Sequence, residues 1–190
     1  MAISFNETNK VFKLDAGAST YAFMIEPNGY VAHLYYGPEV ASDAFAYLYR
    51  PMERAFSPAA PGTTAPESRD VILQEFGTNG VGDFHAPSII VRQGNGHTVT
   101  DFKYRSHQIR KGKPALPGLP ATFGSDDDVD TLELSLYDEA SDVEILLRYS
   151  AFRKYNAIAR SVQVVNHSAE TVHLEKIASA ALDFADGRLD

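Results

Sequence analysis

The sequence predicts an all-β fold, an antiparallel β-sandwich, because short runs of alternating apolar and polar residues are separated by turn-forming residues. Leu132, Leu134 and Leu136 alternate with Glu133 and Ser135, which is the two-residue period of a half-buried strand. Tyr and Phe, which favour strands, number 10 and 11, whereas Trp is absent. We expect about ten to twelve strands in two packed antiparallel sheets.

Two β-hairpins are predicted in the first half of the chain. In each, two β-rich segments flank a turn that contains Asn and Gly, residues that tolerate the positive φ of tight turns. The first hairpin joins 20–26 to 30–36 through 27–29, and the second joins 89–91 to 98–100 through 93–96.

A third turn is predicted at 138–141, ahead of two further strands. Apolar residues alternate with polar ones over 143–149 and again over 158–164. Arg160 interrupts the apolar face of the second of these segments. Both segments therefore have the pattern of half-buried strands.

Two irregular Pro-rich loops interrupt the strands, at about 51–70 and about 111–123. The first contains four prolines and the second three, and Pro donates no hydrogen bond to a sheet. Long irregular loops in a compact domain are functional or interfacial, or else surface excursions, and both interpretations remain open here. The chain is expected to form one domain over 1–190.

Composition excludes several classes of function. The 190 residues include no Cys, which excludes disulfides, thiolate metal sites and Cys nucleophiles. A net charge of -8 disfavours binding to the phosphate backbone of nucleic acid. The N-terminal residues lack the basic and apolar regions of a secretory signal, and no stretch reaches the ~20 apolar residues of a membrane span. We therefore expect a cytoplasmic protein that binds neither nucleic acid nor a membrane.

Residue patterns alone identify no catalytic residue, metal site or cofactor. The Gly-rich segment 77–83 lacks the Lys-Ser/Thr ending of a phosphate-binding loop. Asp83 and His85 are placed to share one strand face, but two ligands are fewer than the three or four that zinc needs. A retaining glycosidase needs two carboxylates about 5–5.5 Å apart, and nothing in the chain marks such a pair among its 25 Asp and Glu residues.

Eight short segments resemble, in the same order, the N-terminal domain of bacterial α-galactosidases of glycoside hydrolase family 36. They are GYVAHLYYG at 29–37, ERAFSP at 53–58, LQEF at 73–76, GDFHAP at 82–87, DFKYRSH at 101–107, KGKP at 111–114, GLPAT at 118–122 and NAIARS at 156–161. They span most of the chain, which makes the resemblance specific.

The resemblance implies a β-sandwich of the supersandwich type, followed in the same polypeptide by a (β/α)8 catalytic barrel and a small C-terminal β-domain. In the family the barrel carries the nucleophilic and the acid/base aspartates of a retaining α-galactosidase that acts on raffinose-type α-galactosides. It is absent from this chain, which is predicted to be inactive alone. The resemblance also implies a truncated sandwich, with the domain over 1–190 incomplete at its C-terminus and the apolar run 171–184 left exposed.

The resemblance assigns substrate binding to Glu53 and Arg54. Bacterial members of the family are typically homotetramers in which an N-terminal loop of one subunit reaches the sugar pocket of its neighbour. Glu53, where the family often has Asp, is expected to accept hydrogen bonds from a distal sugar of the galactoside. In the alternative interpretation, Arg54 pairs with Glu53 or Glu75 and only holds the loop in place.

Two positions depart from the family pattern. Some relatives use a basic residue from the middle of the loop, whereas this chain has Ala65 and Pro66 there, with Arg69 nearby. The family motif Asp-Phe-Arg stands here as DFH at 83–85, and His cannot reproduce the planar two-point donor of Arg.

Two other functions remain open on the sequence. A stand-alone β-sandwich that binds carbohydrate or protein needs no downstream barrel, and Tyr35, Tyr36, Tyr47 and Tyr49 are then the candidate platforms for sugar stacking. A different family substrate, an α-N-acetylgalactosaminide, or a galactosyl transfer reaction would be decided by the barrel.

Overall fold

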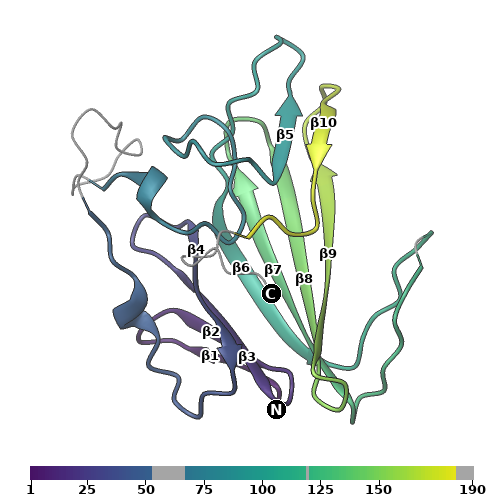
Figure 1. Cartoon of the computed structure of the whole chain (residues 1–190). Helices are drawn as coiled ribbons and strands as arrows, with labels where there is room; N and C mark the ends of the chain where they lie inside the picture. Colours follow the sequence, from purple (N-terminus) through teal and green to yellow (C-terminus); the bar gives the residue numbers. More distant parts are fainter. Residues whose placement is uncertain (53–66, 119, 183–190) are drawn as a thin grey trace.

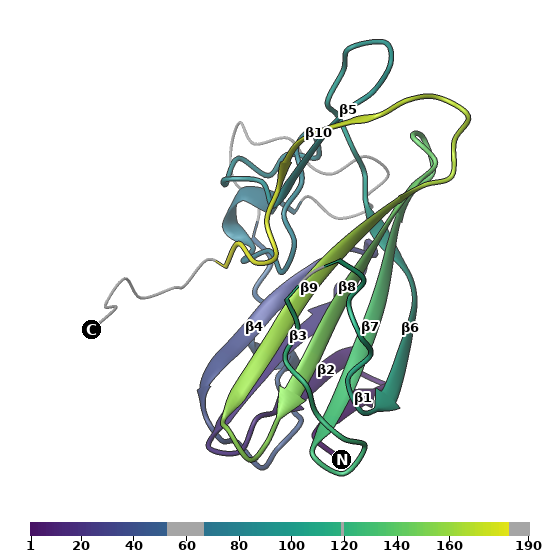
Figure 2. The ribbon, with the colours of Figure 1, turned by 90° about the vertical axis from the view of Figure 1, so that its right-hand side faces the viewer.

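The computed structural model describes residues 1–52, 67–118 and 120–182, which contain ten strands and two short 3-10 helices. Two four-stranded antiparallel sheets pack face to face (Figures 1 and 2), which confirms the predicted all-β sandwich. The first sheet has the order β1-β2-β3-β4 and the second the order β6-β7-β8-β9, so neighbouring strands follow one another along the chain.

The first sheet is built from β1 (Ile3–Asn6), β2 (Val11–Asp15), β3 (Ser19–Ile25) and β4 (Val31–Pro38). The predicted hairpin over 20–36 is confirmed as β3 and β4, and Gly29 in its turn has a φ of 90°. A φ of this sign strains any residue that carries a Cβ, which explains why Gly stands at this position.

The second sheet is built from β6 (Lys103–Lys111), β7 (Val129–Asp138), β8 (Val143–Phe152) and β9 (Ala157–Asn166). The predicted turn at 138–141 joins β7 to β8 and continues to Asp142, which has a φ of 54°. The three strands predicted around this turn and after it are confirmed, with Leu134 opposite Leu147 and Leu147 opposite Val162.

The predicted hairpin over 89–100 is wrong in its second strand. The turn forms, with the Gly96 amide donating to the Gln93 carbonyl over 2.9 Å, but β5 (Ile89–Arg92) pairs with β10 (His173–Ile177). The Thr100 amide instead donates to the Asn79 carbonyl over 3.0 Å. Because turn propensity depends only on neighbouring residues, it does not determine which distant strand forms hydrogen bonds with β5.

The main core lies between the two large sheets. Most of its members are inward-facing apolar residues of these two sheets, including Phe12, Leu14 and Phe23 from the first and Leu132, Leu134, Leu136, Ile145 and Leu147 from the second. The alternating pattern of the sequence thus places one face of each strand in the core, as the strand period requires.

The opposite face of the first sheet is also covered. Met24 and Leu34 on that face pack with Phe45 and Ile72, which lie on either side of the first Pro-rich loop. Two 3-10 helices, η1 (Ala46–Leu48) and η2 (Arg69–Val71), belong to the same covering segments. The segments that enter and leave this loop are therefore packed on the sheet.

The edge of β4 is closed by the segment 73–75. The His33 amide donates to the Leu73 carbonyl over 2.8 Å, and the Glu75 amide donates to the Val31 carbonyl over 3.0 Å. This short pairing removes an open sheet edge. Within the described residues, no helix is long and apolar enough to span a membrane.

Candidate functional site

The predicted substrate-binding residues Glu53 and Arg54, together with Ala65 and Pro66, lie outside the described residues. The structure does describe the two segments from which their loop emerges, residues 49–52 and 67–69, which we call the loop stem. The Ser68 amide donates to the Met52 carbonyl over 3.1 Å, which joins the two sides of the stem. Glu53 is the residue that follows Met52.

Tyr49 ties the stem to the β3–β4 turn. Its hydroxyl lies 3.1 Å from Glu67 Oε2 and 3.3 Å from Glu26 Oε2, and Asn28 Nδ2 donates to the same two oxygens over 3.2 and 3.1 Å. Burial, reinforced by the charges of Glu26 and Glu67, raises the pKa of Tyr49 well above its ordinary value. The hydroxyl therefore stays protonated as a donor between two carboxylates.

Arg69 holds the other side of the stem. Its guanidinium lies 3.5 Å from the Tyr30 ring centroid, Nη2 donates to Gln74 Oε1 over 2.6 Å, and Nη1 lies 3.5 Å from Glu26 Oε1. Only 4% of the Arg69 side chain is exposed. The sequence placed Arg69 near the position where some relatives have a basic loop residue, and in the structure its side chain is buried in the stem.

A second polar cluster lies between the two large sheets, centred on Glu75. Its carboxylate is fully buried and accepts hydrogen bonds from Tyr21 (2.5 Å) and Tyr149 (2.7 Å). Arg160 Nη2 lies 2.8 Å from Glu75 Oε1, and His33 Nδ1 lies 3.4 Å from Glu75 Oε2. The cluster thus joins β3, β4, β8 and β9 to the segment that closes the edge of β4.

The charges of this cluster follow from its surroundings. Burial acts to raise the pKa of Glu75, but the Arg160 charge and the hydrogen bonds from His33 and Tyr21 outweigh it and bring the pKa below its ordinary value. Burial, together with the Glu75 charge, raises the pKa of Tyr149 far above its usual range. A carboxylate, a guanidinium and neutral tyrosines thus form a hydrogen-bonded cluster between the two sheets.

Sequence reasoning missed this cluster, although one signal was present. Arg160 occupies an apolar position of a strand, and a buried cation requires a buried partner of opposite charge. The alternative interpretation pairs Arg54 with Glu53 or Glu75, and Arg54 lies outside the described residues; the structure pairs Glu75 with Arg160.

The DFH segment forms a local pair. His85 Nδ1 lies 2.6 Å from Asp83 Oδ1, and the Asp83 side chain is almost completely buried, whereas Phe84 is exposed. Within the described residues, no group of three or more His, Cys, Asp or Glu side chains is arranged to hold a metal ion. The candidate site is the loop stem, and the Glu75 cluster is a separate set of buried polar residues between the sheets.

The four tyrosines that were candidate sugar platforms separate into two pairs. Tyr35 and Tyr49 pack against the apolar cluster on the outer face of the first sheet. Tyr36 and Tyr47 are exposed, at 54% and 70%.

Comparison with known proteins identifies relatives along the whole chain. The model of the glycosyl hydrolase family 36 N-terminal domain matches residues 29–190. Alpha-galactosidase AgaA of Geobacillus stearothermophilus is 38% identical over 191 residues, 100% of this chain and 26% of that protein. Alpha-galactosidase 1 of Pediococcus pentosaceus is 37% identical over 190 residues, 99% of this chain and 26% of that protein.

Solved structures agree with these matches. The crystal structure of the family 36 alpha-galactosidase AgaB from Geobacillus stearothermophilus has a TM-score of 0.90 at 37% identity, over 97% of this chain and 25% of that one. A variant of AgaA from the same organism, in complex with raffinose, has a TM-score of 0.87 at 39% identity, over 93% of this chain and 25% of that one. The chain thus spans about a quarter of the length of these relatives.

The loop stem yields a testable prediction. Replacing Tyr49 by Phe removes the hydroxyl between Glu26 and Glu67, and one such hydrogen bond contributes about 1 kcal/mol. We expect the Ser68 amide to exchange with solvent about five times faster, measured by hydrogen–deuterium exchange, while core amides of β7 and β8 are unchanged. Tyr47→Phe, at an exposed position two residues away, is the matched control. Equal exchange of Ser68 in both variants would contradict a role for Tyr49 in holding the stem.

Proposed function

The chain belongs to the glycosyl hydrolase family 36 N-terminal domain family, and from this we propose that it is the N-terminal, non-catalytic domain of an α-galactosidase. The polypeptide that contains it carries out retaining hydrolysis of terminal α-galactosides in a downstream (β/α)8 barrel. The observation that carries the proposal is that alpha-galactosidases match 99 to 100% of this chain over only 26% of their own length.

Raffinose-type oligosaccharides are the proposed substrates. One relative with a TM-score of 0.87 to this chain, the alpha-galactosidase AgaA, has been solved as one variant in complex with raffinose and as another in complex with stachyose. Both ligands belong to the class of α-galactosides that the sequence resemblance implies.

For this domain we propose a supporting role in a cytoplasmic homotetramer. Glu53 and Arg54 of one subunit bind the outer sugar of a substrate held by a neighbouring subunit. The loop stem supports this assignment. The hydrogen bond between Met52 and Ser68 joins the two sides of the stem at the residue that directly precedes Glu53. A carboxylate and a guanidinium offer an acceptor and a planar donor, and both bind sugar hydroxyls well.

The first experiment separates this domain's role from that of the polypeptide. We expect the purified 190-residue chain to release no nitrophenol from a nitrophenyl α-galactoside, and the full polypeptide to release it. Turnover by the isolated chain would contradict a non-catalytic domain. Sugar binding by the isolated chain in calorimetry, with no activity of the full polypeptide, would instead support the stand-alone binding module.

The second experiment tests Glu53 in the full polypeptide. Glu53→Gln removes a charged acceptor from the outer sugar, so we expect the KM for raffinose to rise about tenfold, which corresponds to about 1.4 kcal/mol, with kcat nearly unchanged. Hydrolysis of a nitrophenyl α-galactoside, which lacks the outer sugars, should not change. Glu39→Gln, at an exposed carboxylate, is the control. An equal rise in KM for both substrates would contradict an outer-sugar role.

A further inference from the structure

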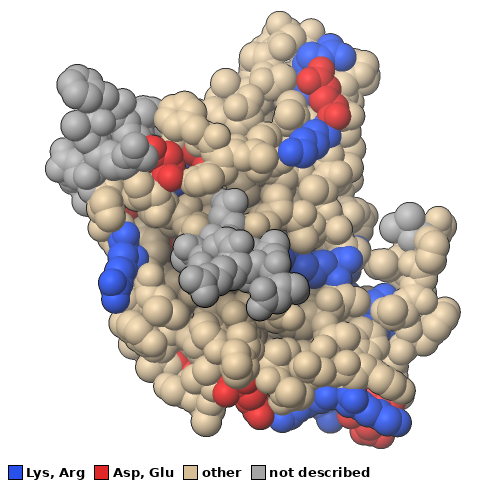
Figure 3. Space-filling model, in the orientation of Figure 1, with Lys and Arg blue, Asp and Glu red and all other residues tan. Residues whose placement is uncertain are grey.

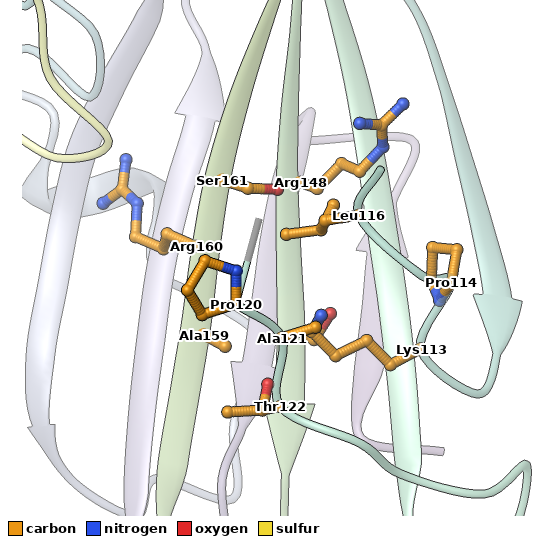
Figure 4. Close-up of a pocket in the computed structure, with 11 residues that line it drawn as sticks. Lys113, Pro114, Leu116, Pro120, Ala121, Thr122, Arg148, Ala159, Arg160 and Ser161 are labelled. Atoms are coloured by element: carbon orange, nitrogen blue, oxygen red, sulfur yellow. The ribbon is translucent and has the colours of Figure 1, made fainter. Parts of the chain in front are cut away.

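A pocket lies between the second Pro-rich loop and the outer face of the second sheet (Figure 4). Its volume is ≈ 170 Å³, and its walls include Lys113 and Thr122 from the loop, Arg148 and Ser150 from β8, and Ser161 from β9. Among the described residues that line it, none is Asp or Glu. Arg160 also lines the pocket, but its guanidinium points away from Arg148 and Ser161 (Figure 4), and its Nη2 lies 2.8 Å from Glu75 Oε1.

Two hydrogen bonds and a positive φ at Gly112 define the base of the loop. Gly112 has a φ of 76°, and a Cβ on it would lie 2.4 Å from Asp126 Oδ1. Its amide donates to the Val129 carbonyl over 2.7 Å, and its carbonyl accepts a hydrogen bond from Thr131 Oγ1 over 2.7 Å. Lys113, the next residue, therefore starts from a fixed backbone position.

The Lys113 ammonium is buried without an acceptor. Its side chain runs beneath the loop toward Ala121 (Figure 4). Its Nζ atom is shielded from solvent and has no hydrogen-bond partner among the described residues. Removing an unpaired ammonium from water is unfavourable, so a partner that supplies negative charge would be bound favourably.

Two arginines near the pocket share one carboxylate. Arg148 Nε and Arg110 Nη2 share one carboxylate oxygen, Glu133 Oε2. Lys113 therefore adds a further positive charge to two arginines that share a single carboxylate. Figure 3 shows basic atoms in the notch between the body of the sandwich and the projecting loop, on a chain whose net charge is -8.

Hydroxyl groups complete the polar lining. Thr131 Oγ1 donates to the Gly112 carbonyl, so in the 2.9 Å contact between Thr131 and Ser150 the proton comes from Ser150. Thr122 and Ser161 carry the other hydroxyls of the wall. Hydroxyl donors beside a cation are suited to an anionic oxygen ligand.

We infer that this pocket binds a carboxylate group, with Lys113 Nζ as its counter-charge and the Thr122 and Ser161 hydroxyls as further donors. A volume of ≈ 170 Å³ is below the roughly 300–1,000 Å³ of ordinary ligand pockets. The pocket therefore suits one small carboxylate or one Asp or Glu side chain and not an oligosaccharide. The carboxylate can come from a free small molecule or from an Asp or Glu side chain of the polypeptide, and two experiments distinguish these sources.

The test for a free carboxylate uses the full polypeptide and acetate at constant ionic strength. We expect saturable broadening of the acetate methyl signal in ligand-observed NMR, weakened at least tenfold by Lys113→Met and unchanged by Lys111→Met. Lys111 is an exposed lysine two residues away, which makes it a matched control for charge. Thr122→Val leaves Lys113 in place and removes one hydroxyl donor, so it should weaken acetate binding by a smaller factor. This variant tests the pocket independently if Lys113→Met fails to fold.

The test for a carboxylate of the polypeptide itself is cross-linking with a carbodiimide, which joins an amine to a carboxylate in contact with it. Mass spectrometry should then find Lys113 linked to an Asp or Glu side chain, with the link absent after Lys113→Met. Either positive result supports the inference and identifies the source. The inference is overturned if acetate binding is absent or equally affected in the two lysine variants and Lys113 forms no cross-link.

Discussion

The structure depends on one buried ion pair, between Glu75 and Arg160. A carboxylate enclosed between two sheets needs a cation and hydrogen-bond donors, because removing it from water is costly. Arg160 comes from β9, and the tyrosine donors come from β3 and β8. Because Glu75 needs all three partners at once, its contacts fix the position of one sheet relative to the other. It also fixes the segment that closes the edge of β4.

The same segment connects the core to the loop stem. Gln74, the neighbour of Glu75, accepts a hydrogen bond from Arg69, and Arg69 meets Glu26, which Tyr49 and Asn28 also contact. Contacts therefore run without a break from the interior of the sandwich to Met52 and Ser68. This continuity anchors the loop stem in the core.

The sequence predicted what depends on short-range patterns. Alternation identified the strands around Leu134 and Leu147, and the Asn-Gly turn identified the β3–β4 hairpin. It did not predict that β5 pairs with β10, because the partner strand lies some eighty residues away and no local turn specifies it. Arg160 was noticed as an exception on an apolar face, but its partner Glu75 is 85 residues away, and several other carboxylates were equally eligible.

A double-mutant cycle on Glu75 and Arg160 tests the central claim most directly. With Glu75→Gln, Arg160→Met and the double variant, urea unfolding followed by circular dichroism gives the free energy of unfolding of each. Each single change should cost about 3–5 kcal/mol, and the double variant about 2–3 kcal/mol less than their sum. Because the pKa of Glu75 is lowered, the coupling should persist at neutral pH and vanish only as the pH falls below the ordinary carboxyl range. Losses that add within about 0.5 kcal/mol at neutral pH would contradict the account.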